Sequence, residues 1–537
     1  MQALPDWLAP LPDAEGMRAV DRWAIDERGV PGLELMERAG AAVVRAVERI
    51  SADGPVTILC GKGNNGGDGL VVARLLRDSS RSVTVVCVSA PSELAGDARA
   101  NLERLPGAAP VRLDGTPWSE DPGSPGSAPG LPGLDGDGAV AVDALLGTGF
   151  AGEPHGEVAR AIELLAQLDA PIVSVDVPSG VDASTGVVAG QAVSADATVT
   201  FHAGKPGLWI APGKARAGTV HTADIGIPRG APLGATVGLI SPRVVEALPR
   251  REANWTKFRS GQVVVAGGSR GLSGAPALAA RASMRAGAGY VIACVPASQQ
   301  PVLASSGTPE MMTRALAEDE GAGTLAEGAA EAVLAAVERG GSLALGPGLG
   351  RSDGAFALAR RVAREARIPL VLDADALNAH AGRLEELVDR PAPAVLTPHA
   401  GEMGRLLDRG SEEVERERLR SAREAAQRSG CVVVLKGDDT LVADPAGRVA
   451  VSGAGTPALA TAGSGDVLTG VIAALLAQGL DAFTAAAAGV WLHAQAGREA
   501  ARKLGVVEGV IASDVIDALP RARAAWAGDG TAAGTET

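Results

Sequence analysis

Short apolar runs that end in glycine- and aspartate-rich loops recur along the whole chain. They cover residues 55–60, 82–89, 139–146 and 171–177 in the first half, and residues 261–266, 342–345, 369–372, 394–396 and 431–435 in the second. Continuous runs rich in Val, Ile and Leu are typical of parallel strands that are covered on both faces. Amphipathic patterns of helical period lie between them, for example over residues 14–50. The pattern therefore predicts the α/β class, with a parallel sheet in each half.

A chain of 537 residues is too long for a single core, so more than one domain is expected. We predict a first domain over residues 1–228, a connector over 229–253, a second domain over 254–520 and a polar tail over 521–537. Residues 106–138 are rich in Pro, Gly, Ser and Asp and are expected to form a surface loop insertion in the first domain.

Composition argues against a nucleic-acid-binding, a membrane-spanning or a secreted protein. The net charge of −14 argues against a nucleic-acid-binding surface. The most apolar stretch, residues 467–491, is broken by Gln478 and Asp481, so we expect core helices and no membrane span. The four cysteines show no Cys-x-x-Cys spacing and the N-terminus shows no signal-peptide pattern. We therefore expect buried free thiols in a reducing compartment, the cytoplasm.

The first strand of the first half ends in a loop of unusual composition. Residues 61–69 read Gly-Lys-Gly-Asn-Asn-Gly-Gly-Asp-Gly and lead into an apolar helix. A strand, a glycine loop and a helix form the geometry that holds a pyrophosphate. Asn64, Asn65 and Asp68 add oxygen atoms that suit a hard cation. This loop is expected to bind an anionic ligand and a metal ion together.

Two further strand ends carry acidic or hydroxyl side chains. Asp143 lies at the end of one strand, and Asp176 and Ser179 follow the next. Ligands of open α/β sheets gather at the carboxyl ends of the strands, so these residues are expected to converge with Asn65. Lys205, in a turn after residues 197–201, has two possible orientations, toward the site or toward solvent, and solvent is the default expectation.

These motifs resemble the NAD(P)H-hydrate epimerase domain. The resemblance rests on residues 63–69, on Val-Asp-Ala-Leu-Leu-Gly-Thr-Gly at 142–149 and on Val-Asp-Val-Pro-Ser-Gly at 175–180. It implies a Rossmann-like fold, interconversion of R and S NAD(P)H hydrate, and K⁺ held by Asn65, Asp143 and Ser179. Asp176 is expected to handle the proton in epimerisation. The implied hydrate-binding residues are Asn64, Asn65, Gly66, Gly67, Asp68, Gly147, Thr148, Gly149, Phe150, Ala151, Gly152, Glu153 and Asp176.

The main candidate site of the second half is a Gly-Ser-Gly-Asp sequence. Residues 463–466 precede an apolar helix whose free N–H groups and dipole favour phosphoryl oxygens. Asp466 beside such a seat would repel phosphate unless it accepts a proton from an attacking hydroxyl. Lys436 at another strand end suits nucleotide phosphates. Asp373 and Glu402 suit Mg²⁺ held through water.

Together these segments resemble the nucleotide-dependent NAD(P)H-hydrate dehydratase domain of the ribokinase-like superfamily. The motifs are Lys436-Gly437-Asp438, the strand ends at 373–378 and 397–402, and residues 463–466. The resemblance implies that ADP or ATP phosphorylates the C6 hydroxyl of the hydrate, after which loss of phosphate regenerates NAD(P)H. The implied hydrate contacts are Ala275, Gly350, His399 and Asp466. The implied nucleotide contacts are Lys436, Gly437, Asp438, Asp439, Thr440 and Gly465.

The combined resemblance implies a bifunctional repair enzyme that takes NAD(P)H hydrate and ADP or ATP, and we expect a homo-oligomer. The alternative is a vitamin-precursor kinase of the hydroxyethylthiazole type, which shares the Gly-x-Gly-Asp step, fused to a non-catalytic Rossmann-like binding module. Such a kinase leaves the intact Asn64, Asp143 and Asp176 motifs of the first half unexplained.

Overall fold

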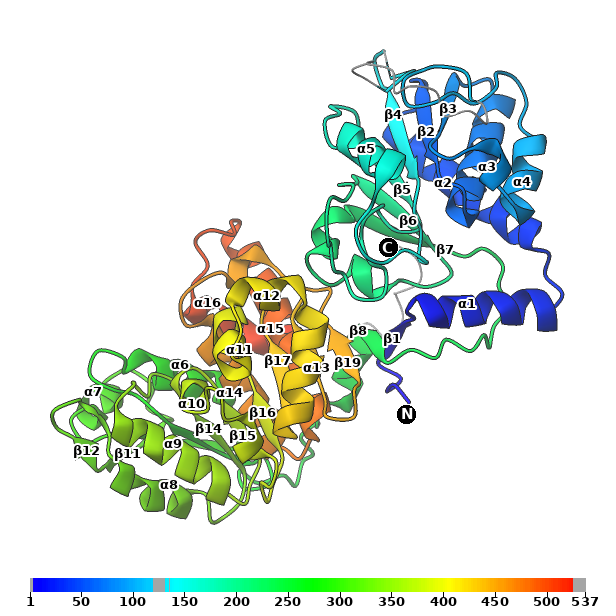
Figure 1. The fold of residues 1–537 in the computed structure, drawn as a ribbon. Coiled ribbons are helices and arrows are strands. Elements are labelled where there is room, and N and C mark those ends of the chain that lie inside the picture. The colour runs from blue at the N-terminus through cyan, green and yellow to red at the C-terminus, as the bar shows by residue number, and fades with distance from the viewer. Residues whose placement is uncertain (1–2, 119–130, 135, 525–537) are drawn as a thin grey trace. The chain divides into compact units, whose positions relative to one another are not determined.

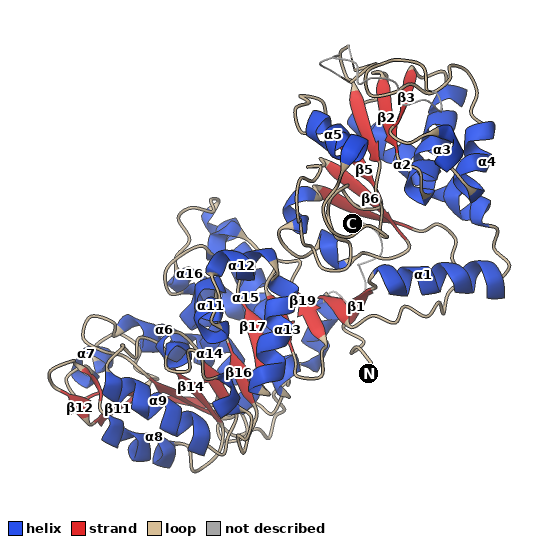
Figure 2. Cartoon of the chain, in the orientation of Figure 1, coloured by secondary structure: helices blue, strands red, loops and turns tan. Residues whose placement is uncertain are grey.

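The computed structural model describes residues 3–118, 131–134 and 136–524. The chain folds as two compact units, one formed by residues 10–236 and the other by residues up to 9 together with residues from 237 onward (Figure 1). Most of the predicted tail and the middle of the predicted insertion lie outside the described residues. Both units are α/β, as the apolar pattern predicted (Figure 2).

The unit of residues 10–236 is built on a six-stranded parallel sheet with the order β3-β2-β4-β5-β6-β7. The chain runs from β2 to β3 on one side and then returns to β4 on the other side of β2. This reversal creates a crevice at the carboxyl ends of β2 and β4, where ligands of such sheets bind. The strands are β2 (Val56–Cys60), β3 (Val83–Cys87), β4 (Val140–Ala144), β5 (Ile172–Val175), β6 (Ala197–Phe201) and β7 (Thr219–Ala223).

Helices cover both faces of this sheet. Apolar residues of α2 and α3 pack on one face in one core cluster, and α5 packs on the other face in a second cluster. The helices are α1 (Ala14–Arg22), the π-helix η1 (Trp23–Glu27), α2 (Gly32–Ile50), α3 (Asn64–Asp78), α4 (Gly96–Glu103) and α5 (Gly156–Leu165), with the 3-10 turns η2 (Pro91–Glu93), η3 (Pro206–Leu208) and η4 (Gly213–Arg216).

The described ends of the predicted insertion pack against the rest of the unit, where an exposed surface loop was expected. Val111 bridges to Val86 of β3, and the Trp118 indole N–H donates to the carbonyl of Ser89 at 2.7 Å. Leu113 and Leu131 are buried in the cluster beneath α5. The apolar residues within a Pro- and Gly-rich stretch therefore extend the core of the unit.

The second unit contains an eleven-stranded sheet with the order β1-β8-β19-β18-β17-β16-β15-β14-β9-β10-β11. Strand β9 is again a point of reversal, between β10 on one side and β14 on the other. The strands are β8 (Val237–Ile240), β9 (Gln262–Ala266), β10 (Tyr290–Pro296), β11 (Met312–Leu316), β14 (Ser342–Leu345), β15 (Leu370–Leu372), β16 (Ala394–Leu396), β17 (Val432–Leu435), β18 (Leu441–Ala443) and β19 (Val449–Val451), and β12 (Glu318–Asp319) pairs with β13 (Thr324–Leu325) outside this sheet.

The helices of this unit cover its sheet. Helices α6, α14, α15 and α16 share one large core cluster with the apolar side chains of the strands. The helices are α6 (Gly274–Arg285), α7 (Gln300–Ala304), α8 (Ala330–Ala336), α9 (Asp353–Glu365), α10 (Asp375–Asn378), α11 (Ala400–Leu407), α12 (Ser411–Arg416), α13 (Arg418–Ser429), α14 (Ser464–Ala477), α15 (Ala482–Leu504) and α16 (Ala512–Ala524), with the 3-10 turns η5 (Pro242–Ala247), η6 (Glu327–Ala329), η7 (Leu384–Leu387) and η8 (Pro457–Leu459).

The N-terminal segment joins the sheet of the second unit. Strand β1 (Leu8–Leu11) lies beside β8, and the backbone N–H and side-chain hydroxyl of Ser241 donate to the carbonyl of Trp7 at 3.0 and 2.8 Å. The Trp7 ring packs 5.8 Å from that of Phe483. Residues 229–253, expected as a connector, therefore contribute a strand to the second unit.

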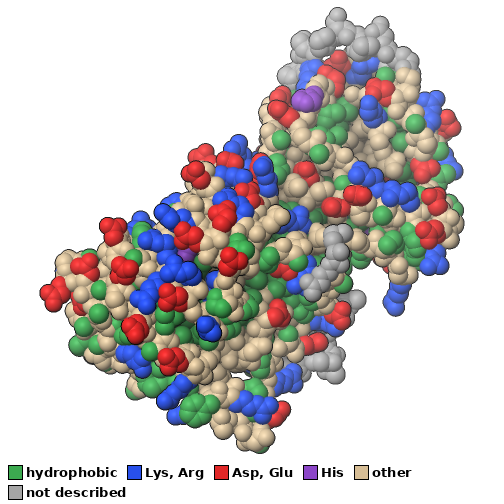
Figure 3. Space-filling model, turned by 60° about the horizontal axis from the view of Figure 1, so that its bottom comes forward, with side chains coloured by type: hydrophobic (Ala, Val, Ile, Leu, Met, Phe, Trp, Pro, Cys, Tyr) green, Lys and Arg blue, Asp and Glu red, His purple; other side chains and the backbone are tan. Residues whose placement is uncertain are grey.

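The cysteines, the apolar helices and the surface charges were considered in the sequence and can be located in the structure. All four cysteines are buried and carry free thiols, as predicted. None of the helices within the described part of the chain is long and apolar enough to cross a membrane. On the face shown in Figure 3, basic and acidic side chains are interspersed.

Candidate functional site

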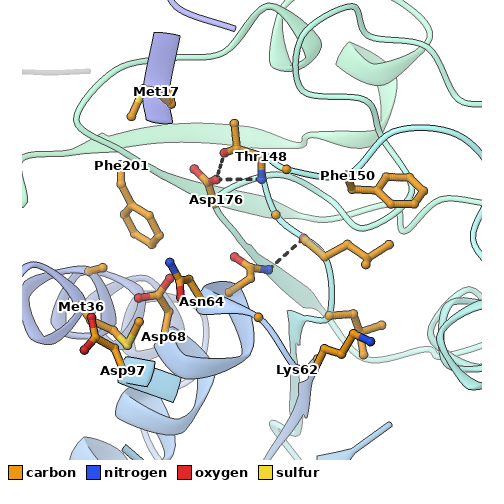
Figure 4. A pocket seen from close by; sticks show the side chains of 18 of the residues that line it. Met17, Met36, Lys62, Asn64, Asp68, Asp97, Thr148, Phe150, Asp176 and Phe201 are labelled. Atoms are coloured by element: carbon orange, nitrogen blue, oxygen red, sulfur yellow. Dashed lines mark hydrogen bonds between the residues drawn. The ribbon is translucent and has the colours of Figure 1, made fainter. Parts of the chain in front are cut away.

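A cavity of about 830 Å³ opens at the reversal point of the first unit, where the loops after β2, β4 and β5 meet (Figure 4). Of the residues predicted in this half, Asn64, Asn65, Asp68, Gly147, Thr148, Gly149, Phe150 and Asp176 line it. Gly66 and Gly67 are buried within α3, and Ala151, Gly152 and Glu153 are exposed outside the cavity. Asp143 and Ser179 also lie off its wall, so the cavity gathers eight of the predicted residues and leaves out these seven.

The floor of the cavity depends on close backbone approach. Helix α3 begins at Asn64, directly after the loop, and a Cβ at Gly66 would overlap the carbonyl oxygen of Gly61. Only glycine fits there, so the loop can fold against the start of the helix. An anion seat at this helix N-terminus stays a prediction, and Asn64 and Asn65 of its first turn line the cavity.

Asp176 is held in one orientation by a dense set of partners. Its backbone lies in the left-handed region at φ 65°, which is rare for a residue with a side chain. One carboxylate oxygen accepts from the Lys205 ammonium at 2.6 Å, and the other accepts from the Thr148 hydroxyl. Thr200 adds a third donor, at 3.1 Å. Burial alone would raise the pKa of Asp176, but Lys205 and these hydroxyls bring it below the usual value.

Lys205 corrects one expectation. We predicted that it faces solvent, yet its side chain is 1 % exposed and lines the cavity. Besides Asp176, its ammonium donates to Thr200 Oγ1 at 2.8 Å and to the Phe201 carbonyl at 3.0 Å. These partners lie on β6 and after β5, so the burial of Lys205 depends on tertiary packing that its own turn does not indicate.

The three residues predicted to hold K⁺ surround the segment after β4. Asn65 Nδ2 donates to the Leu146 carbonyl at 2.8 Å, and the Ser179 hydroxyl donates to Asp143 Oδ1 at 2.5 Å. Asp143 is fully buried, and burial raises its pKa despite hydrogen bonds from Ser179, Ser174 and Leu145. Among the described residues no Lys or Arg pairs with it. A buried carboxylate without a cationic partner, with amide and hydroxyl oxygens beside it, fits a cation.

In the second unit the tip of α14 carries the predicted Gly-Ser-Gly-Asp step. Gly463 caps the helix in the left-handed region at φ 85°, and Asp466 lies in its first turn. A Cβ at Gly465 would lie 3.5 Å from the Lys436 ammonium. The cation after β17 and the N-terminus of α14 therefore face the same space, as a phosphate site requires.

Lys436 connects the carboxylates of this edge. Its ammonium lies 3.0 Å from Asp373 Oδ1 and 3.7 Å from Glu402 Oε2. Asp373 also accepts from the Thr469 hydroxyl of α14 at 2.7 Å. Asp466 has no such partner among the described residues, and its burial and the charge of Asp373 raise its pKa to about 7.

The remaining predicted residues of this half lie at neighbouring strand ends. His399 caps α11 by accepting from the Gly401 N–H at 3.0 Å, and its ring remains 56 % exposed. A Cβ at Gly348 would lie 3.2 Å from the Ala275 Cβ, so the loop that ends at Gly350 passes close to the start of α6.

Asp439 differs from its neighbours in the predicted nucleotide segment. Gly437 and Asp438 are exposed, whereas Asp439 is fully buried and pairs with Arg418 at 2.8 Å. Arg418, itself 1 % exposed, also donates to the Lys436 carbonyl at 3.2 Å. This pair fixes the backbone that carries Lys436. Arg418 lies on α13, and its sequence context gave no signal for this role.

The chain is similar to known proteins in both of its units. A family model described as NAD(P)H-hydrate dehydratase matches residues 263–521, and one described as YjeF-related protein N-terminus matches residues 32–207. The chain is 42 % identical over 518 residues to the bifunctional NAD(P)H-hydrate repair enzyme Nnr of Moorella thermoacetica, which covers 94 % of this chain and 95 % of the relative.

Two further proteins are similar. The enzyme of the same name from Salinibacter ruber is 41 % identical over 542 residues, with 97 % of each chain covered. The crystal structure of ADP/ATP-dependent NAD(P)H-hydrate dehydratase from Bacillus subtilis, co-crystallised with ATP/Mg²⁺, is 28 % identical with a TM-score of 0.45, and covers 53 % of this chain and 96 % of that one. The two family models fall on different compact units, one on each.

Proposed function

The chain belongs to the family of bifunctional NAD(P)H-hydrate repair enzymes, and we propose that its two units divide the repair between them. The enzyme interconverts R and S NAD(P)H hydrate and, with ADP or ATP, converts the S form to NAD(P)H. We assign epimerisation to residues 10–236 and dehydration to residues 237–524. The observation that carries this assignment is that each unit has its own helix N-terminus and its own acidic side chains at the carboxyl edge of its sheet.

In the dehydratase unit Asp466 is the proposed base. It takes the proton of the C6 hydroxyl while the hydroxyl oxygen attacks the terminal phosphorus of the nucleotide. The N-terminus of α14 and Lys436 stabilise the charge on the transferring phosphoryl group. Phosphate then leaves C6, C5 gives up a proton, and the ring double bond of NAD(P)H is restored.

The nucleotide contacts follow from the exposed part of the segment after β17. Lys436, Gly437, Asp438 and Thr440 face the bound phosphates or nucleoside, and Gly465 lets the phosphoryl group approach α14. We propose an indirect role for Asp439, because its carboxylate is buried against Arg418. It holds the shape of the loop and does not contact the nucleotide.

Asp373 and Glu402 are the residues that would hold Mg²⁺ through its water shell. Both are largely buried, and both share Lys436 as a partner. Among the described residues no three His, Cys, Asp or Glu side chains form a metal cluster. This fits Mg²⁺, which one or two carboxylates and the phosphates of a substrate usually hold together. The ion would neutralise charge on the nucleotide.

The pH dependence of dehydration tests the role of Asp466. A base acts only when it is deprotonated, and the folded protein raises the pKa of Asp466 from 3.8 to about 7. Activity should therefore be full above about pH 8 and should fall roughly tenfold per pH unit well below pH 7. The measurement is kcat/KM for the S hydrate against pH. An inflection at the ordinary carboxyl value near pH 4 would contradict a base with this raised pKa, and an acid limb that stays unchanged in Asp466→Asn would remove Asp466 as the base.

In the epimerase unit we propose that Asn65, Asp143 and Ser179 hold K⁺. The ion would neutralise Asp143 and fix the loop that carries Gly147 and Thr148 at the wall of the cavity. The buried, cation-free Asp143 carboxylate supports this assignment.

Thermal unfolding tests the K⁺ site without relying on activity. A ligand present at 100 times its Kd stabilises the folded state by about 2.7 kcal/mol, so K⁺ should raise the Tm of this unit by about 5–11 °C. Tetramethylammonium at the same ionic strength is the control and should have no effect. An equal rise with both salts, or no rise with K⁺, would contradict the site. Asp143→Asn should abolish the response to K⁺.

A further inference from the structure

Asp68 is a buried carboxyl group to which no described residue is paired by a hydrogen bond or an ion pair. It is the fifth residue of α3, it is 8 % exposed, and it lines the cavity of the epimerase unit. Its side chain forms no hydrogen bond or ion pair with any residue that the structure describes. Burial of an unpaired ionised group is costly, so a carboxyl group in this position is either neutral or awaits a partner from the ligand.

Asp176 lines the same cavity but, unlike Asp68, has several hydrogen-bond and ion-pair partners. It is also 8 % exposed, but Lys205, Thr148 and Thr200 all donate to it. Figure 4 shows Asp68 rising from α3 and Asp176 from the loop after β5, both within one pocket. One carboxyl group is thus fully supplied with donors, and the other is supplied with none.

Burial and the neighbouring charged and polar groups shift the pKa values of Asp68 and Asp176 in opposite directions. Burial, and then the charges of Asp176 and of Asp21 on α1, raise the pKa of Asp68 well above its usual value, while Lys205 opposes this rise. Burial alone would also raise the pKa of Asp176, but Lys205, Thr148 and Thr200 lower it. A pocket in which the pKa of one carboxyl group is raised and that of the other is lowered has the composition of a general acid and a general base.

We propose that Asp68 is a second catalytic residue of epimerisation, which gives a proton to the departing C6 hydroxyl while Asp176 takes a proton from the water that replaces it. This inference rests on the proposed function of the unit. It assigns to Asp68 a chemical step, where the family resemblance implied only contact with the hydrate.

The step follows from the bonding at C6, which carries both the ring nitrogen N1 and the hydroxyl. The electron pair of N1 forms an N1=C6 double bond as the C6–O bond breaks, and the oxygen leaves as water with the proton of Asp68. A water molecule then adds to the other face of C6, the electrons return to N1, and Asp176 accepts the released proton. The ring is cationic between these events, and the carboxylates of Asp176 and Asp21 stabilise that charge.

One turnover leaves Asp68 ionised and Asp176 protonated. That form is ready to convert the product epimer back, and exchange of protons with solvent restores the starting form. Each carboxyl group therefore serves one direction as acid and the other as base, as the reversibility of epimerisation requires.

The test is Asp68→Asn, which keeps the shape of the side chain and removes the transferable proton. We expect kcat for R-to-S conversion to fall by about 10²–10⁴-fold with KM changed by less than about threefold. Asp78→Asn, at the end of the same helix and exposed, is the matched control and should keep the wild-type rate. The thermal unfolding curve of each variant, compared with that of the wild type, reports whether the epimerase unit is folded.

The pH profile separates acid catalysis from a structural role. Wild-type kcat/KM should fall at alkaline pH as Asp68 loses its proton, and Asp68→Asn should lack this limb. A rate within about threefold of wild type for Asp68→Asn, or a loss expressed only in KM, overturns the inference. Absence of epimerisation in the wild-type chain is a different outcome, because it overturns the proposed function of the unit itself.

Discussion

Replacement of Asp466 by Asn is expected to slow dehydration of the S hydrate by about 10²–10⁴-fold and to leave epimerisation unchanged. The amide keeps the size of the side chain in the first turn of α14 but does not accept the proton of the C6 hydroxyl. The measurement is the rate at which the absorbance of the reduced nicotinamide ring returns from purified S hydrate with saturating nucleotide.

The control for this variant is Asp408→Asn. Asp408 is exposed in the same unit and lies in the left-handed region at φ 57°, a conformation that Asn tolerates. It should keep the wild-type rate. If Asp466→Asn keeps a rate within about threefold of wild type, the proton acceptor lies elsewhere in the site.

Replacement of Lys205 by Met is expected to abolish measurable epimerisation and to destabilise the epimerase unit by about 3–5 kcal/mol. The Lys205 and Asp176 side chains are 1 % and 12 % exposed, so loss of the ammonium leaves a buried carboxylate without its counter-ion. The pKa of Asp176 then rises, because Lys205 no longer opposes the effect of burial. Denaturant titration and the rate of epimerisation are the two measurements.

A double variant distinguishes stability from catalysis. Lys205→Met combined with Asp176→Asn removes both charges, and it should recover a large part of the lost stability while epimerisation stays absent. The expected dehydratase rate is that of the wild type in both variants. Recovery of epimerisation in the double variant would show that neither side chain takes part in the chemistry.

The sequence predicted the strands and the loops of both sites because their signals are local. Apolar runs end in glycine and aspartate at 60–69 and 143–149, and a Gly-Ser-Gly-Asp step opens an apolar helix at 463–466, so each loop has a local signal. The same locality explains why Asp143, Asp176 and Asp466 were found: each follows or begins a regular element at the carboxyl edge of its sheet.

Residues whose role depends on distant partners were not predicted. Lys205 has no local signal for burial, since its partners Asp176 and Thr200 come from other elements. Arg418 is one of many charged residues on α13, and only the folded chain places it against Asp439. The strand β1 pairs with β8 more than two hundred residues away, so no nearby pattern indicates it.

Asp439 shows the limit of carrying a motif over by position. It lies within the segment that the resemblance assigned to the nucleotide, yet it is buried beneath that segment. A run of consecutive residues at a strand end alternates between facing the ligand and facing the core, and the sequence does not state which residue does which.

Both activities can be measured together when the chain is supplied with a mixture of R and S NADH hydrate and ADP or ATP. We expect the absorbance of NADH to rise until all of the hydrate is consumed, because epimerisation continually feeds the S form to the dehydratase unit. A rise that stops at the S fraction of the mixture would contradict epimerisation, and no rise at all would contradict the assignment of the dehydratase unit.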